Sequence, residues 1–115
     1  MKLGVNMQII LYEHKTEKVH TQTIAILEFG KFTLSGYDQY LPTKEVPEGG
    51  EYEYEILLDM ISTQKMIELL APGKSDSEVL EVVKERFGGE RADIRFQAFC
   101  VEHDIETYCS SYFDD

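Results

Sequence analysis

The hydrophobic pattern of this chain changes near residue 59, and that change constrains its fold more than any other feature. Before it, apolar and polar residues alternate with a period of two, as in strands with one buried face. After it, apolar residues recur at intervals of three and four, as on the buried side of a helix. A run of strands followed by a run of helices predicts an α+β domain, with helices packed on one face of a mainly antiparallel sheet.

Four strands are expected before the change. The alternation places them at Val5–Tyr12, Val19–Phe29, Phe32–Tyr37 and Glu51–Leu58. The polar segment Glu13–Lys18 is expected to be a turn. Asp38–Gly50 contains two prolines and two glycines and is expected to be a loop.

The clearest local signal is the segment from Phe29 to Phe32, which contains Gly30 and Lys31. A Gly-X pair favours a two-residue hairpin loop, because glycine accepts the positive φ required at its first position. We therefore expect a loop at Gly30-Lys31. That register pairs Phe29 with Phe32, and it pairs the next two leucines, at 27 and 34, with each other.

Two helices are expected directly after the change. Ser62 or Thr63 is expected to cap the first helix, which Pro72-Gly73 ends. Ser75 and Glu78 have the spacing of a capping box, in which each side chain satisfies a free backbone N–H at the start of a helix. This second helix is expected to end at the following glycine pair.

A third helix is expected over residues 91–103, although Ile94–Val101 is also compatible with a strand. Glu106–Phe113 alternates weakly, so we expect it to form a last strand that joins the sheet. With the four earlier strands, this gives a sheet of four or five strands and about three helices.

Length and composition fit a single domain. A chain of 115 residues with 43% hydrophobic residues has enough apolar side chains for a core, which argues against intrinsic disorder. No segment is apolar for long enough to span a membrane, and the first residues lack the apolar run of a signal peptide. Two cysteines without an export signal suggest reduced thiols, so a cytoplasmic location is expected.

Charge is distributed unevenly along the chain. Residues 1–44 carry four acids and five bases, whereas residues 45–115 carry eighteen acids and six bases. So acidic a chain is repelled by nucleic-acid phosphates and by anionic lipids, which argues against nucleic acid or a membrane as a direct ligand. The imbalance favours a positively charged partner instead.

The densest run of acids, Glu45–Asp59, holds six acids and no base. One interpretation is a solvated outer sheet face, or an edge strand protected by charge against further pairing. The other is a docking surface for a basic protein, with nearby tyrosines as anchors. Tyr52 and Tyr54 are more typical of core or hairpin positions, so the predicted partner-binding residues are Glu45, Glu48, Glu51, Glu53, Glu55, Asp59, Tyr37 and Tyr40.

Cys100, His103 and Cys109 are the only residues with a spacing that resembles a metal site. On a helix Cys100 and His103 share a face, and zinc accepts two thiolates and an imidazole. Against a metal, the chain lacks a C-x-x-C pair, and buried free cysteine is common in cores. A disulfide between the two cysteines is geometrically possible but disfavoured in a reducing compartment. No catalytic or phosphate-binding motif is present, and no cofactor is expected.

Three functions follow from these features. The first is a small protein-binding module, such as an inhibitor, an immunity protein or an anti-defence protein, that docks on a basic nuclease or another nucleic-acid-handling protein. The second is a small metal-binding protein or enzyme that uses the two cysteines and His103. The third is a structural or self-associating domain, such as a homodimer formed through Val19–Phe29 or the tyrosine-bearing hairpins.

Overall fold

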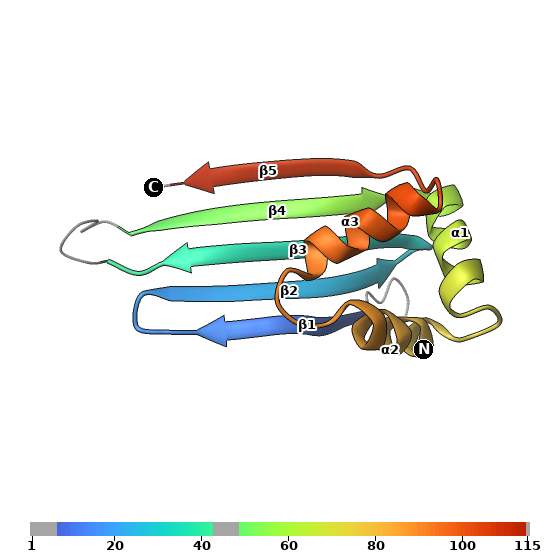
Figure 1. Cartoon of the computed structure of the whole chain (residues 1–115), viewed down its shortest axis with the longest axis horizontal. Coiled ribbons are helices and arrows are strands. Elements are labelled where there is room, and N and C mark those ends of the chain that lie inside the picture. The colour runs from blue at the N-terminus through green and yellow to red at the C-terminus, as the bar shows by residue number, and fades with distance from the viewer. Residues whose placement is uncertain (1–6, 43–48, 115) are drawn as a thin grey trace.

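The computed structural model of the chain describes residues 7–42 and 49–114, with side chains to Tyr112. It contains one antiparallel sheet in which sequential strands are neighbours, in the order β1-β2-β3-β4-β5. The strands are β1 (Met7–Lys15), β2 (Val19–Glu28), β3 (Lys31–Tyr40), β4 (Gly50–Leu58) and β5 (Tyr108–Asp114). Three helices complete an α+β fold, which confirms the predicted fold class (Figure 1).

The helices are α1 (Met60–Leu70), α2 (Asp76–Phe87) and α3 (Ala92–Glu102). They lie on one side of the sheet, where α2 contacts β1 and β2 and α1 contacts β3 and β4 (Figure 1). None of the helices in the described part of the chain is long and apolar enough to cross a membrane.

The core lies between this helix layer and the facing side of the sheet. Period-two alternation puts Ala25, Leu27, Phe32, Leu34, Ile56 and Leu58 on that side of the strands, all buried. Phe96 of α3 packs over the sheet, with its ring centroid 5.1 Å from that of Phe32. The rings of Phe87 and Phe99 extend the same aromatic cluster.

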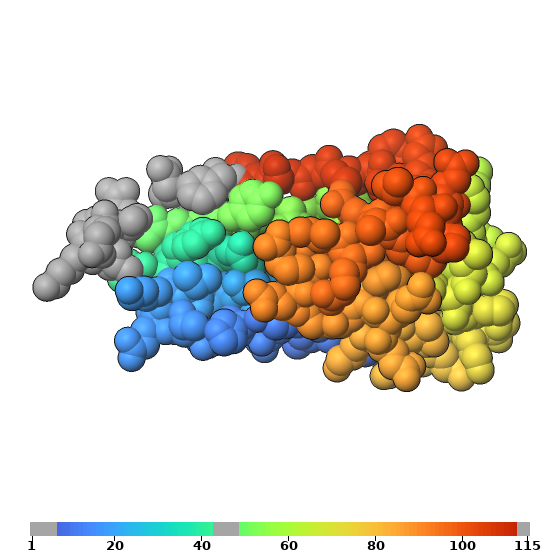
Figure 2. Space-filling view, in the orientation of Figure 1, coloured from blue at the N-terminus to red at the C-terminus, as the bar shows by residue number. Residues whose placement is uncertain are grey.

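The helices cover only part of this sheet face. In Figure 1 they lie over one end of the strands, and none of these three helices reaches the opposite end. The space-filling view shows the same step at the start of α3, beyond which side chains of β2, β3 and β4 become visible (Figure 2). The helix-facing side of the sheet is therefore a buried core at one end and an accessible surface at the other.

The β2–β3 hairpin differs from the prediction in register. The two loop residues are Phe29 and Gly30, both with positive φ as a type I′ turn requires, and Leu27 pairs with Phe32. This register also places Glu28 opposite Lys31, a pair of opposite charges. The predicted loop was therefore one residue too late. The shift changes the pairing by two residues, so Leu27, Phe32 and Leu34 still face the core, whereas Phe29 lies exposed in the turn.

Strand β1 contains a bulge that the alternation did not reveal. Ile10 pairs with Ile24 and Tyr12 pairs with Thr23, which leaves Leu11 without a partner across the ladder. Leu11 is buried, and its carbonyl accepts a hydrogen bond from the backbone N–H of Gly89, 3.0 Å away. The bulge reverses the alternation at the end of β1, so that Tyr12 faces the helix side, whereas an unbroken alternation from Ile9 and Leu11 places it on the opposite side.

Other boundaries shift modestly. β1 continues to Lys15 beyond the predicted turn, and β3 continues to Tyr40 through the start of the predicted loop, because both segments pair with β2. The predicted residues 5 and 6 of the first strand lie outside the described range. β4 has the predicted extent to within one residue, and the last strand forms at Tyr108–Asp114.

The first helix begins earlier than predicted. Asp59 is the N-cap of α1, and its carboxylate accepts a hydrogen bond from the N–H of Ser62 at 2.8 Å. Thr63 is buried, and its hydroxyl accepts a hydrogen bond from the N–H of Phe32 at 2.9 Å, which ties α1 to the hairpin. The capping box of Ser75 and Glu78 at the start of α2 is confirmed, as is the helical form of the third segment.

Candidate functional site

The acidic strand β4 presents its glutamates on the side of the sheet opposite the three helices. Glu51, Glu53 and Glu55 lie on the opposite side of the strand from the buried Ile56 and Leu58, as predicted. Glu53 and Glu55 are exposed, and Glu51 is half-buried. Residues two apart on a strand are separated by about 6.8 Å, so the three carboxylates form a closely spaced row.

The outer part of this row has uncharged neighbours in the register of the sheet. Glu53 lies between Tyr37 and Tyr112 in the register of the sheet, and Glu55 lies between Ser35 and Ser110. Among the described side chains, no lysine or arginine forms a salt bridge with either glutamate. Their negative charge is therefore directed into solvent.

Tyrosine side chains flank the row on both sides. The hydroxyl of Tyr37 lies 3.4 Å from Nδ1 of His20, and the two rings meet edge to face at 5.4 Å. Nε2 of His20 lies 2.9 Å from Oε2 of Glu13, and this hydrogen bond is the main reason that the pKa of Glu13 falls below its usual value. Tyr37 is thus held half-buried, whereas Tyr112 is 61% exposed.

We call the surface formed by Glu51, Glu53, Glu55, Tyr37 and Tyr112 the acidic face. It brings together four of the eight predicted partner-binding residues and adds Tyr112, which the sequence did not single out.

The other four predicted residues do not belong to it. Tyr40 lies on the helix-facing side of β3, because it has the same parity as the buried Leu34. Asp59 caps α1 at the end of the sheet. Glu45 and Glu48 lie outside the described residues.

Acidic residues are not confined to the acidic face. The helix layer exposes further carboxylates, among them Glu81 and Glu85 on α2. The charge of residues 45–115 is therefore spread over two sides of the molecule. What distinguishes the acidic face is the alignment of three carboxylates on one strand beside the exposed ring of Tyr112.

The residues considered for a metal do not converge. Cys100 is buried in the core, and burial raises the pKa of its thiol to about 12. His103 is the C-cap residue of α3, with its ring 4.6 Å from that of Phe99, and Cys109 is exposed on β5, where its sulfur accepts a hydrogen bond from Gln97. Both cysteines are free thiols. In the part of the chain that the structure describes, no three His, Cys, Asp or Glu side chains are placed to hold a metal ion.

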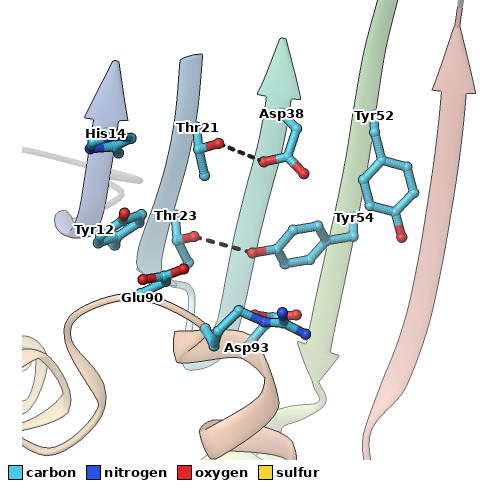
Figure 3. Close-up of a pocket in the computed structure, with 10 residues that line it drawn as sticks. Tyr12, His14, Thr21, Thr23, Asp38, Tyr52, Tyr54, Glu90 and Asp93 are labelled. Carbon is cyan, nitrogen blue, oxygen red and sulfur yellow. Dashed lines mark hydrogen bonds between the residues drawn. The ribbon is translucent and has the colours of Figure 1, made fainter. Parts of the chain in front are cut away.

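A polar pocket lies on the other side of the sheet, at the end that the helices leave uncovered (Figure 3). Its volume is about 500 Å³. Its floor and walls come from four strands and from the start of α3, and its lining residues are Tyr12, His14, Thr21, Thr23, Asp38, Tyr52, Tyr54, Glu90, Arg91 and Asp93. None of these was predicted as a site residue.

Gly36 is the residue that lets Tyr54 reach across the pocket floor. A Cβ atom at position 36 would lie 2.3 Å from the hydroxyl and Cζ of Tyr54, so only glycine leaves room for the ring. The ring crosses β3, and its hydroxyl lies 3.1 Å from Oγ1 of Thr23 on β2 (Figure 3). Glycine inside a predicted strand is a recognised sign of such close approach, and it was the one available signal for this site.

The wall at the start of α3 is fixed by Arg95. Its guanidinium donates hydrogen bonds to the carbonyls of Phe87 at 2.7 Å and Gly88 at 2.8 Å, at the end of α2. The segment between α2 and α3 is also bonded to the bulge of β1, through the hydrogen bond from Gly89 to Leu11. The bulge thus turns Tyr12 toward the pocket and also anchors the opposite wall.

The chain matches no protein-family model, no curated protein and no solved structure.

Proposed function

We propose that this protein is a binding module that docks on a basic protein through its acidic face. The observation that supports this most strongly is the pair Glu53 and Glu55, which form no salt bridge with a described lysine or arginine and lie beside the exposed ring of Tyr112. Exposed charges of one sign accelerate encounter with an oppositely charged surface, and tyrosine supplies contact area with few rotamers.

Apolar side chains next to the acidic face support the same use. Leu57 of β4 is 38% exposed and pairs with Tyr108 of β5, which is 52% exposed. On the same side of the sheet Ile10 is 43% exposed. An interface needs such apolar area at its centre and charge at its rim.

The specific form of the proposal is an inhibitor, of the immunity or anti-defence type, that occupies the basic groove of a nuclease or a similar nucleic-acid-handling protein. Carboxylates about 6.8 Å apart have half the linear charge density of one DNA strand, with one phosphate about every 3.4 Å. The row therefore imitates a nucleic-acid backbone only in part, and the tyrosines must supply the remaining affinity. Such a partner would be met in the cytoplasm, where free thiols such as Cys100 and Cys109 stay reduced.

The proposal is tested with the protein that co-purifies with the tagged chain from its native cell. We expect the association rate with that protein to fall steeply as salt is raised, because the attraction is between exposed charges. If the partner cleaves or binds nucleic acid, added chain should inhibit it in competition with the nucleic acid. An association rate that is independent of salt would contradict the proposal.

Two other functions from the sequence are tested by cheaper measurements. A stoichiometric metal found by elemental analysis would favour the metal-binding hypothesis. A mass that rises with concentration in light scattering would favour self-association. The backbone of β2 is paired on both sides, with β1 and β3, so self-association through that strand would have to use its side chains.

A further inference from the structure

The polar pocket has the composition of a site for a small organic cation. Two aromatic pairs face each other across its floor: Tyr12 with His14 on β1, and Tyr52 with Tyr54 on β4 (Figure 3). The Tyr12 and His14 rings are nearly parallel, with centroids 6.4 Å apart, and the Tyr52 and Tyr54 centroids are 6.0 Å apart. Aromatic faces attract cations through their quadrupole.

The charges that line the pocket are mainly negative. Asp38 lies on the floor, and Glu90 and Asp93 lie at the start of α3, against Arg91, the one lysine or arginine among the described residues that line the pocket. Thr21 donates a hydrogen bond to Oδ1 of Asp38 at 2.8 Å, and no described donor binds its Oδ2. One oxygen of this half-buried carboxylate is therefore open to a ligand.

The pKa of Tyr54 reflects the same negative charges. Burial raises the pKa of Tyr54 above its usual value, and the carboxylates of Asp93 and Asp38 raise it further. The phenol thus stays protonated at neutral pH. The phenol and the Thr23 hydroxyl form one hydrogen bond in which either group can donate, so the phenol oxygen keeps a lone pair for another donor.

We propose that the polar pocket binds a guanidinium group. A guanidinium is planar, stacks on tyrosine rings and offers five N–H donors in a rigid fork, which suits a pocket with aromatic walls and carboxylate and hydroxyl acceptors. A volume of about 500 Å³ exceeds the need of the group itself and falls in the range of small-molecule sites. The group belongs either to a free small molecule or to an arginine side chain of another protein.

An anion is the alternative ligand, because the cationic side chain of Arg91 and the first N–H groups of α3 both attract negative charge. The three carboxylates outnumber that single cation, and each would repel an anionic ligand. The two possibilities predict opposite effects of replacing Arg91. The variant Arg91→Gln should bind a cation more tightly and an anion more weakly.

The test is an NMR titration of the full chain at low ionic strength with three probes: N-ethylguanidinium, its neutral analogue N-ethylurea, and inorganic phosphate. We expect N-ethylguanidinium to shift the signals of Tyr12, Thr23 and Tyr54 with a dissociation constant of about 1 mM, and N-ethylurea to have no effect. Saturable binding of phosphate that weakens in Arg91→Gln, or equal binding of the urea and the guanidinium, would overturn the proposal.

Variants locate the binding. Asp38→Asn keeps an acceptor for Thr21 and should weaken N-ethylguanidinium about tenfold, as should Asp93→Asn. The matched controls are Asp76→Asn, which removes the equivalent first-turn acid of α2, and Glu53→Gln on the opposite side of the sheet. Both controls should bind within twofold of the unaltered chain. A loss as large in the controls as in the pocket variants would overturn the proposal.

A capped Gly-Arg-Gly peptide distinguishes the two sources of the group. Binding of N-ethylguanidinium without the peptide assigns the pocket to a free small guanidine. Binding of the peptide at equal or higher affinity assigns it to an arginine of another protein. The pocket and the acidic face lie on opposite sides of the sheet. Charge reversal at Glu53 and Glu55 should therefore leave this titration unchanged.

Discussion

Gly36 illustrates how one missing side chain shapes this molecule. It lies within a strand, where glycine is unfavourable, yet its empty face is filled by the ring of Tyr54. Through this contact β4 supplies a hydroxyl to β2, two strands away.

Gly36→Ala is therefore expected to lower the free energy of unfolding by about 1–3 kcal/mol, because the added methyl group displaces the ring of Tyr54 from Thr23. Chemical denaturation measures this loss. The double variant Gly36→Ala/Tyr54→Ser should recover part of it, since the smaller side chain leaves room for the new Cβ. Strictly additive losses would show that the two positions do not compete for space.

Tyr54 should also give the folded state an alkaline limit. Its pKa is raised by folding, so the protonated phenol favours the folded state. This contribution is complete below pH 10, the usual pKa, and is lost as the pH rises through the higher folded value. The free energy of unfolding should fall less steeply above pH 10 in Tyr54→Phe than in the unaltered chain. Identical pH profiles would contradict the assignment.

The two cysteines should differ in reactivity. Burial raises the pKa of Cys100 to about 12, so at pH 8 its thiol is protonated as well as inaccessible. Cys109 is exposed. A thiol reagent should modify one cysteine in the folded chain and two in denaturant, and Cys109→Ser should abolish the reaction of the folded chain. Rapid modification of Cys100 in the folded Cys109→Ser variant would show that the core around α3 opens.

At the scale of elements, the β2–β3 hairpin carries local strain. Phe29 has φ 53° in the turn and is 68% exposed, so it gains little from burial in exchange for a left-handed backbone. Leu27 and Phe32 pair directly behind it, and their burial outweighs this cost.

Phe29→Asn should raise the free energy of unfolding by about 1 kcal/mol, because asparagine tolerates the left-handed region. Phe29→Ala is the control, since it shortens the side chain without relieving the backbone. Thermal and chemical unfolding of both variants measure the difference. An equal change in the two would place the effect in the side chain and not in the turn.

The elements also show what could be predicted from the sequence. Alternation and capping residues predicted the five strands, the three helices and the row of glutamates on β4, because those features depend on local periodicity. The β1 bulge depends on Leu11 meeting Gly89, a contact 78 residues apart in the chain. The polar pocket could not be predicted for the same reason, because its lining residues are far apart in the chain. The alternation placed Tyr12 on the opposite side of β1, and Asp38 was expected in a loop.

At the scale of the whole molecule, the sheet separates two surfaces with different chemistry. The side of the sheet opposite the three helices carries the acidic face, and the uncovered end of the helix-facing side carries the polar pocket (Figure 3). Net charge alone does not distinguish these surfaces from the acidic helix layer. A test of the account must therefore change charge at one place and compare it with the same change elsewhere.

The most direct measurement is the association rate with the co-purifying partner for two matched double variants. Glu53→Lys/Glu55→Lys reverses charge on the acidic face, and Glu81→Lys/Glu85→Lys makes the same change in net charge on α2. We predict that the first slows association at least about tenfold and the second less than about threefold. Equal effects, or a larger effect of the α2 variant, would contradict the claim that this protein binds through its acidic face.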